Sequence, residues 1–368
     1  MTPSSALIAY CRAGFESEAG ADLLRLAGGE GARLDLAAAP DGGYVIGRIV
    51  PPLREPRTDP WRAALAAATP IFARSMLHAR GPYAIANAAA TAGAHGQARV
   101  DRVTPLMAAI DAWGPAPWQS AWVEFPDTND GKSLSSLARA LGTRIEASLR
   151  ARGALAHDAP RRLHIFLVDG ATAWLGETPP SVVAWPLGIP RLRKPGGAPS
   201  RSTLKLAEAF ATFLGEREPT LLRPGMHAVD LGAAPGGWTW QLAQRGLRVV
   251  AVDNGPLKGS VAADALVTHV RGDGFRWRPR KAVDWVVCDI VEQPIRIAEL
   301  MARWVVEGAA RRAIFNLKLP MKKRFAEVER CEQRIGEMLR HARLPMTLRI
   351  RQLYHDREEV TAYLAPLP

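Results

Sequence analysis

The sequence predicts an α/β protein: an N-terminal α+β domain followed by a doubly wound sheet that closes with an antiparallel hairpin. Three observations support this class. From residue 203 onward, short apolar runs alternate with segments of helical periodicity. A glycine-rich turn follows the first of these runs, at the place where doubly wound sheets bind ligands. Before residue 177, strands and helices follow no regular order. We expect domains at 1–177 and 200–368, joined by a linker at 178–199.

The N-terminal half contains short apolar runs and a few amphipathic segments. Strands are predicted at residues 7–12, 43–50 and 121–125, and a hairpin at 163–168 and 171–175 around Asp169-Gly170. Helices are predicted at residues 17–27, 61–77 and 133–152, the second of them open to interruption at Pro70. Residues 80–105, rich in alanine and glycine, favour no element.

The predicted linker begins at Thr178 and ends at Pro199, with six prolines and three glycines between these limits. Such a composition is typical of a connecting segment. The segment also contains Arg191-Leu-Arg-Lys194. This basic cluster either solvates the linker or contacts nucleic acid.

The C-terminal half follows a βαβα order. Its predicted strands are 226–231, 248–252, 267–271, 282–288 and 312–317, and its predicted helices are 203–214, 239–245, 294–307 and 325–340. Two further strands, 348–353 and 360–364, flank a polar turn and form the closing hairpin.

The positive charge of the chain lies almost entirely in its second half. The formal net charge is +12. Residues 1–190 carry 18 Lys+Arg against 17 Asp+Glu, whereas residues 191–368 carry 30 against 19. A basic surface of this kind suits a polyanion such as nucleic acid, although a basic composition can also serve solubility alone.

The chain has no run of about 18 apolar residues, so no membrane partner is expected. Its N-terminus lacks the basic segment and the long apolar core of a signal peptide. Cys11, Cys288 and Cys331 are far apart in the sequence and favour neither a disulfide framework nor a zinc site. We therefore expect a cytoplasmic protein without a metal centre.

The glycine-rich turn reads Asp230-Leu-Gly-Ala-Ala-Pro-Gly-Gly-Trp238. Glycine lets the backbone approach a ligand closely, and a strand-to-helix turn at this edge of a sheet is a ligand site. Dinucleotide-binding proteins also have such a turn. Here, however, Pro235-Gly236-Gly237-Trp238 replaces the spaced third glycine of their fingerprint.

Acidic residues end the next three predicted strands. Asp253 can accept hydrogen bonds from both ribose hydroxyls of a nucleoside, Asp273 can reach an adenine amino group, and Asp289 ends the fourth strand. This succession of acids suits S-adenosylmethionine, which carries a cationic sulfonium and no pyrophosphate. The alternative is that these acids are solvated loop residues.

Two lysines and two acids, Lys205, Asp289, Lys318 and Glu359, surround this turn in the predicted fold. A ribose 2′-hydroxyl is a weak acid, so methyl transfer to it needs a base held in line. Burial near a second cation, Lys205, would lower the pKa of Lys318 and allow it to be that base. Asp289 would orient both ammonium groups, and Glu359 would close the network. Glu358 and Glu359 are neighbours in a strand, so only one of them can face the site.

Several basic and aromatic residues are candidates for RNA contacts. The run Lys322-Lys-Arg324 and the residues Arg276, Arg278, Arg280 and Lys281 are candidates for phosphates. Phe275 and Trp277 can stack on bases or pack inside the protein, and packing is expected for Trp238.

Long motifs throughout the chain match a known family. The most specific are Phe315-Asn-Leu-Lys-Leu-Pro-Met-Lys-Lys-Arg324 and Gln352-Leu-Tyr-His-Asp-Arg-Glu-Glu-Val360. Shorter ones are Cys11-Arg-Ala-Gly-Phe-Glu16, Pro70-Ile-Phe-Ala-Arg74, Asp127-Thr-Asn129, Gly188-Ile-Pro-Arg191 and Ala198-Pro-Ser-Arg-Ser-Thr-Leu-Lys205. On these motifs the chain resembles the Rossmann-type ribose 2′-O-methyltransferases with a Lys-Asp-Lys-Glu tetrad. It is most similar to the bacterial 23S rRNA cytidine 2′-O-methyltransferases of the RlmM family.

The resemblance implies a THUMP-type RNA-binding domain followed by a methyltransferase domain. It implies S-adenosylmethionine as the methyl donor, 23S rRNA as the partner and Lys318 as the proton acceptor. We also expect a monomer, a state that the sequence itself does not fix. The residues that would line the cofactor are Ser202, Ala234, Pro235, Gly236, Gly237, Asp253, Asp273 and Asp289. Ala234 stands where some relatives have cysteine, but this position contributes mostly backbone.

Other functions stay open at this point. A non-catalytic RNA-binding protein with a vestigial cofactor fold would be unlikely to keep all four tetrad residues. A methyltransferase could act on another RNA or on a nucleobase. Nucleobase methylation usually uses a catalytic cysteine or an Asn-Pro-Pro-Tyr-like clamp, and the sequence contains neither pattern.

Overall fold

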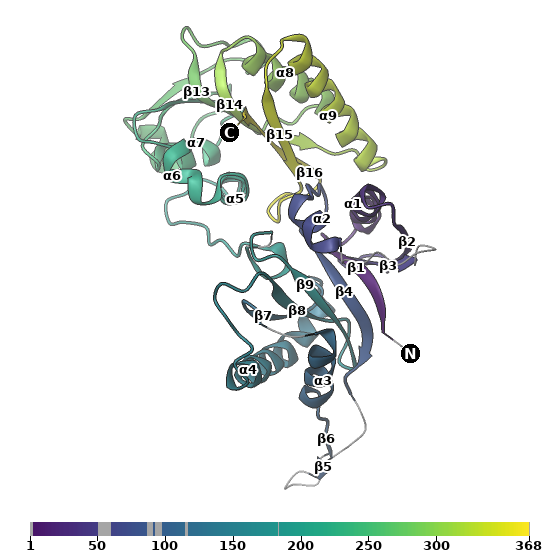
Figure 1. Ribbon diagram of the computed structural model, residues 1–368. Helices are drawn as coiled ribbons and strands as arrows, with labels where there is room; N and C mark the ends of the chain where they lie inside the picture. Colours follow the sequence, from purple (N-terminus) through teal and green to yellow (C-terminus); the bar gives the residue numbers. More distant parts are fainter. Residues whose placement is uncertain are drawn as a thin grey trace. The chain divides into compact units, whose positions relative to one another are not determined.

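The computed structural model describes residues 3–50, 60–86, 91–92, 98–114, 117–182 and 184–367 (Figure 1). The chain divides into two compact units, Met1–Pro190 and Arg191–Pro368. The division falls inside the stretch predicted as a linker, of which residue 183 lies outside the described residues. Among the helices of the described part, none has the length and apolar character needed to cross a membrane.

The first unit is built around a seven-stranded sheet with the order β2-β3-β1-β4-β9-β8-β7. Neighbouring strands are antiparallel except β7 and β8. The strands are β1 (Ser4–Tyr10), β2 (Arg33–Ala37), β3 (Tyr44–Val50), β4 (Ser75–Ala84), β7 (Ala121–Glu124), β8 (Arg162–Leu167) and β9 (Thr172–Thr178), with the short pair β5 (Thr91–Ala92) and β6 (Ala98–Arg99). The helices are α1 (Glu16–Gly29), α2 (Trp61–Ala67), α3 (Val103–Trp113) and α4 (Ser135–Ala151), with the 3-10 turns η1 (Gly131–Leu134) and η2 (Pro186–Gly188). This is the α+β arrangement that the sequence predicts.

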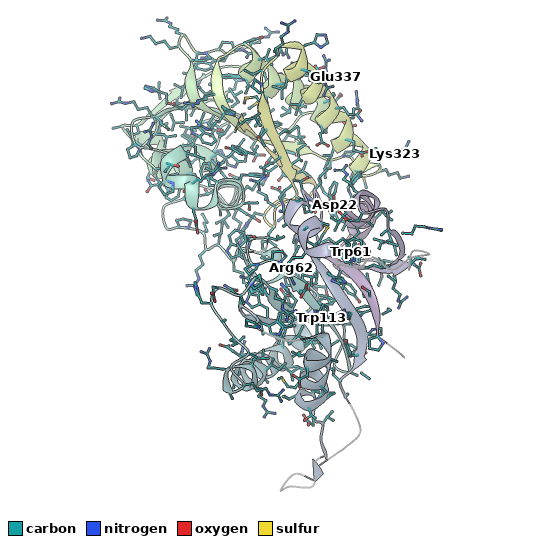
Figure 2. All side chains as sticks on the ribbon, in the orientation of Figure 1. Asp22, Trp61, Arg62, Trp113, Lys323 and Glu337 are labelled. Atoms are coloured by element: carbon teal, nitrogen blue, oxygen red, sulfur yellow. The ribbon has the colours of Figure 1, made fainter. Side chains whose placement is uncertain are left out.

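The helix predicted over residues 61–77 is wrong in its second half. Helix α2 ends at Ala67, and β4 begins at Ser75. Figure 2 labels Asp22 on α1. Its buried carboxylate accepts hydrogen bonds of 2.6–3.1 Å from the backbone N–H groups of residues 71–73, between α2 and β4. Pro70 has no N–H to donate, and the next three amides are taken by Asp22, so the helical hydrogen-bond pattern cannot continue.

The sequence patterns predict neither β2 nor α3. Strand β2 lies at the edge of the sheet and is mostly exposed; polar and apolar residues do alternate along it, but only over the five positions Arg33–Ala37. Helix α3 follows the alanine-rich tract, whose composition favours no element. Its buried residues include Leu106 and Ile110, which pack in one core cluster with Ile145 and Leu149 of α4.

The second unit contains a seven-stranded sheet with the order β12-β11-β10-β13-β14-β16-β15. Its first five strands in this order are parallel, and β16 and β15 are antiparallel to their neighbours. The strands are β10 (His227–Leu231), β11 (Arg248–Val252), β12 (Val267–Val270), β13 (Val283–Cys288), β14 (Ala310–Lys318), β15 (Met346–Arg351) and β16 (Glu359–Pro366). The predicted doubly wound sheet with a closing hairpin is confirmed.

Helices cover both faces of this sheet (Figure 1). They are α5 (Thr203–Phe213), α6 (Glu218–Leu221), α7 (Gly237–Ala243), α8 (Pro294–Val306) and α9 (Arg324–His341), with the 3-10 turns η3 (Gly215–Arg217) and η4 (Gly259–Ala263). A core on one face joins α5 and α7 to the sheet through residues such as Phe210, Trp238 and Trp285. Because the strand order reverses between β10 and β13, the loops after these two strands form the edge where such sheets bind ligands.

Candidate active site

The turn after β10 is shaped by glycines that other residues could not replace. Gly232 and Gly236 have φ values of +75° and +109°, which favour glycine. A Cβ added to Gly232 would lie 2.5 Å from Ile290 Cγ1. A Cβ on Gly237 would collide with the Ser202 hydroxyl. The turn therefore presents bare backbone beside the start of α5.

The predicted acids at the strand ends lie in different surroundings. Asp253, after β11, accepts hydrogen bonds from Ala234 N at 3.0 Å and from Gly255 N at 2.7 Å, and thereby ties the glycine turn to the next loop. Asp273, after β12, accepts one from Phe275 N at 2.8 Å and has a half-exposed side chain. The structure thus brings Asp253 against the turn, whereas Asp273 stands on an open loop.

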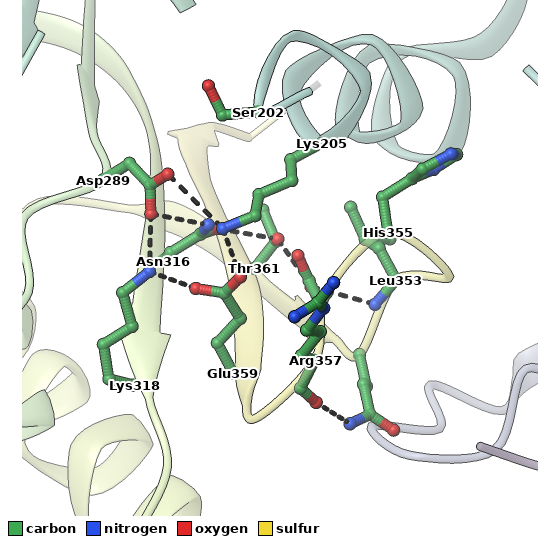
Figure 3. Close-up of polar contacts among 12 residues, drawn as sticks. Ser202, Lys205, Asp289, Asn316, Lys318, Leu353, His355, Arg357, Glu359 and Thr361 are labelled. Carbon is green, nitrogen blue, oxygen red and sulfur yellow. Dashed lines mark hydrogen bonds and ion pairs between the residues drawn. The ribbon is translucent and has the colours of Figure 1, made fainter. Parts of the chain in front are cut away.

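Four charged side chains from four segments of the chain meet at the carboxyl ends of β13 and β14 (Figure 3). Lys318 Nζ lies 2.6 Å from Asp289 Oδ1 and contacts Glu359 Oε2. Lys205 Nζ, from the first turn of α5, lies 3.4 Å from Asp289 Oδ2 and contacts Glu359 Oε1. Each carboxylate therefore bridges both ammonium groups. The four side chains are only 6 to 23 % exposed.

Strand pairing decides which glutamate belongs to this cluster. Glu359 is the register partner of Lys318 in the antiparallel β14–β16 pair, so their side chains share one face. Glu358 precedes the strand, and its Oε2 lies 2.9 Å from Arg324 Nη2. The choice between adjacent glutamates, which the sequence left open, therefore falls on Glu359.

Comparisons with known proteins agree with this geometry. A family model described as FtsJ-like methyltransferase matches residues 198–325, and one described as ribosomal RNA large subunit methyltransferase M, N-terminal, matches residues 101–178. Three curated relatives are named ribosomal RNA large subunit methyltransferase M. The protein of Thauera aminoaromatica is 45 % identical over 99 % of this chain and 98 % of its own. That of Methylococcus capsulatus is 46 % identical over 99 % of each chain. That of Laribacter hongkongensis is 55 % identical over 72 % of this chain and 75 % of its own.

The chain belongs to the ribosomal RNA large subunit methyltransferase M family. As a member of this family it is an S-adenosylmethionine-dependent methyltransferase of ribosomal RNA. The family resemblance read from the sequence motifs is therefore confirmed.

The sequence patterns did not identify two further residues of this methyltransferase site, Asn316 and Thr361. Asn316 Nδ2 donates a hydrogen bond to Asp289 Oδ1 at 3.0 Å, and Asn316 Oδ1 accepts one from Thr361 Oγ1 at 2.8 Å (Figure 3). Both side chains are fully buried. Because side chains alternate along a strand, counting two residues back from Lys318 and two forward from Glu359 finds them.

The charge state of Lys318 differs from the expectation. Burial lowers the pKa of this lysine, but the nearby charges of Asp289 and Glu359 and their hydrogen bonds outweigh that effect and raise it above its ordinary value. The predicted lowering of this pKa by burial beside Lys205 is therefore wrong for this arrangement. The cluster holds Lys318 as an ammonium.

Burial also raises the pKa of two groups on neighbouring strands, Asp230 and Cys288. It raises the pKa of Asp230, on β10, to about 7, against the hydrogen bond that Thr239 Oγ1 donates at 2.6 Å. It raises the pKa of Cys288 to about 12. Cys288 is thus a thiol at neutral pH, which does not suit a cysteine nucleophile of the kind used for nucleobase methylation.

Several candidate RNA contacts have structural partners in the methyltransferase unit. Trp238 is buried and donates a hydrogen bond from Nε1 to the Ser202 carbonyl at 3.1 Å, so its predicted packing role is confirmed. Trp277 stacks on Trp304, and Arg278 donates to the carbonyl of Trp277 at 2.8 Å. The side chain of Arg276 is 90 % exposed, and its Nε lies 3.6 Å from Asp273 Oδ2.

Proposed function

We propose that this enzyme methylates the 2′-hydroxyl of a cytidine ribose in 23S rRNA, with Lys318 as the base, and that it acts as a cytoplasmic monomer. The observation that carries the proposal is the contact of Lys318 with both Asp289 and Glu359 at the carboxyl edge of the sheet. The two carboxylates hold the Lys318 amine in one orientation and stabilise the ammonium that forms when it takes up the ribose proton. A base that must act in line requires both properties.

The residues around the glycine turn fit S-adenosylmethionine. The backbone at Gly236 and Gly237 leaves no room for side chains. Asp253 is fixed by two backbone amides, and its carboxylate oxygens retain lone pairs for ribose hydroxyls. The cofactor supplies an electrophilic methyl group on a cationic sulfur. The residues proposed to hold it are Ser202, Ala234, Pro235, Gly236, Gly237, Asp253, Asp273 and Asp289.

Proton transfer is the task of the tetrad. The ribose hydroxyl gives its proton to the neutral amine of Lys318 as its oxygen takes the methyl group. Before this, Lys318 must lose its own proton to solvent; because Asp289 and Glu359 stabilise the ammonium, the neutral amine becomes more populated as pH rises. Lys205, bound to the same two carboxylates, offsets part of their negative charge and so eases deprotonation of Lys318.

The direct test is methyl transfer to rRNA by Lys318 variants. Labelled methyl transfer and mapping of the modified ribose measure activity, and calorimetry measures cofactor binding. Lys318→Met removes the amine, and Lys318→Arg keeps the charge but cannot release its proton. Both variants are expected to lose at least about 100-fold in kcat while they still bind rRNA. Retained activity of Lys318→Arg would exclude Lys318 as the base. A methyl group found on a base would exclude ribose methylation.

A further inference from the structure

A chain of hydrogen bonds leads from the tetrad into the protein interior. It starts at Asp289 Oδ1, which accepts from Asn316 Nδ2 at 3.0 Å, and passes to Thr361 Oγ1, 2.8 Å from Asn316 Oδ1 (Figure 3). Thr361 Oγ1 in turn lies 2.9 Å from Asp356 Oδ2. Asn316, Thr361 and Asp356 are all fully buried.

Counting protons along this chain fixes its direction. The Asn316 amide must point its NH₂ toward the carboxylate of Asp289, so its oxygen faces Thr361 and can only accept. A threonine hydroxyl has one proton, and it goes to Asn316 Oδ1. The 2.9 Å contact between Thr361 and Asp356 then needs a proton from Asp356.

The surroundings of Asp356 oppose its ionisation. It lies in the turn between β15 and β16, and its carboxyl accepts a hydrogen bond from Leu353 N at 3.0 Å. Two further acids act on it, Glu359 from the tetrad and Glu208 from α5. Glu208 is itself bound by the backbone N–H groups of residues 354 and 355 and by the His355 ring, Nδ1 at 2.6 Å. Burial and these acids together raise the pKa of Asp356 well above its ordinary value.

We propose that Asp356 is a positioning residue which stays protonated at neutral pH and, through Thr361 and Asn316, aims a hydrogen-bond donor at Asp289. An ionised Asp356 would draw the Thr361 proton to itself and leave the Asn316 oxygen facing a lone pair. Asp289 would then lose one of the contacts that hold its carboxylate between the two lysines. The catalytic consequence rests on the proposed function, but the protonation of Asp356 does not.

The protonation state has a direct test in the full-length protein. An infrared difference spectrum of wild type minus Asp356→Asn at pH 7 isolates this one carboxyl from other buried acids. We expect the carbonyl stretch of a protonated carboxylic acid in that difference. The symmetric and antisymmetric stretches of a carboxylate in its place would overturn the proposal, whatever the activity of either protein.

Kinetics test the chain itself. Asp356→Asn keeps a neutral donor and should stay within about threefold of the wild-type kcat, whereas Asp356→Ala and Thr361→Val should each fall about tenfold or more. Thr361→Ser should recover most of the loss. An unchanged dissociation constant for S-adenosylmethionine shows that each variant is folded. Because both changes break one chain, the double variant Asp356→Ala/Thr361→Val should be little worse than either single variant.

Two kinetic outcomes would overturn the proposal: equal losses in Asp356→Asn and Asp356→Ala, or losses that multiply in the double variant. A failure of the proposed function looks different. In that case Lys318→Arg keeps its activity or the methyl group is found elsewhere, while the infrared band of the Asp356 acid is still present.

Discussion

Glu359 lies directly opposite Lys318 in the antiparallel β14–β16 pair, and its carboxylate contacts both Lys318 and Lys205. The two strands come from distant parts of the sequence, and the hairpin that closes the sheet brings them together. The base proposed for the reaction is thus held by a partner that only the antiparallel end of the sheet can supply.

The two adjacent glutamates give a matched pair of variants. Glu359→Gln removes a charge that contacts both lysines, so kcat should fall about 10- to 100-fold through a misplaced Lys318. Glu358→Gln removes an exposed charge paired with Arg324 and should leave kcat within about twofold. Steady-state methyl transfer to rRNA measures both. A comparable loss in the two variants would show that the face of the strand does not matter.

The pH dependence of the reaction should report the charge around Lys318. Burial lowers the pKa of Lys318, but the Asp289 and Glu359 carboxylates raise it by more, so the ammonium persists to alkaline pH and the rate should rise with pH. Asp289→Asn removes one of those charges and lowers this pKa. The rising limb of the single-turnover rate should therefore move to lower pH in Asp289→Asn, even where its maximum is reduced. A limb that moves to higher pH, or does not move, would contradict this assignment.

Stability should depend on pH through Asp230. Its folded pKa of about 7, raised by burial, lies above the unfolded value of about 3.9, so unfolding releases a proton between these limits. The contribution of Asp230 to the free energy of unfolding therefore falls as pH rises through that window, by at most about 1.4 kcal/mol per pH unit. Asp230→Asn lacks the effect and should gain stability relative to wild type between pH 5 and pH 7. Urea unfolding at both values checks this, with the exposed Asp130→Asn as the control for the substitution itself.

The close packing of the glycine turn predicts a steric effect on cofactor binding. A methyl group on Gly237 would collide with the hydroxyls of Ser200 and Ser202 and displace the start of α5. Gly237→Ala should weaken S-adenosylmethionine binding about tenfold or more by calorimetry. Gly196→Ala is the control, because its added Cβ would meet nothing within 4 Å. Equal dissociation constants for S-adenosylmethionine in the two variants would show that the turn accommodates the added methyl group without weakening cofactor binding.

The division of the chain predicts separable tasks. Residues 191–368 hold the tetrad, the glycine turn and nearly all the excess positive charge, and they form a compact unit. A protein truncated to these residues should bind S-adenosylmethionine within about threefold of the full chain, but its KM for rRNA should rise. Cofactor calorimetry and methyl-transfer kinetics on the same preparation measure both. Loss of both properties in a folded fragment would argue against an RNA-recognition role confined to residues 1–190.

The sequence by itself determined the fold class of the second unit and predicted that Lys205, Asp289 and Lys318 lie together. Parallel strands put the residues that follow them at one edge of a sheet, so the position of Asp289 and Lys318 at strand ends predicted their meeting. The helix predicted over residues 61–77 is wrong beyond Ala67. Asp22, about fifty residues away in the sequence, accepts hydrogen bonds from the backbone amides that a longer helix would have used.

The tertiary structure decided what depends on distances between remote segments. The choice of Glu359 over Glu358 follows from the register of β14 with β16. The raised pKa of Lys318 follows from two carboxylates in contact with its amine, which outweigh burial beside Lys205. Asn316 and Asp356 belong to one hydrogen-bonded chain only because Thr361 joins them. A local pattern reveals which residues share a face, whereas the energy of a charge depends on every group around it in three dimensions.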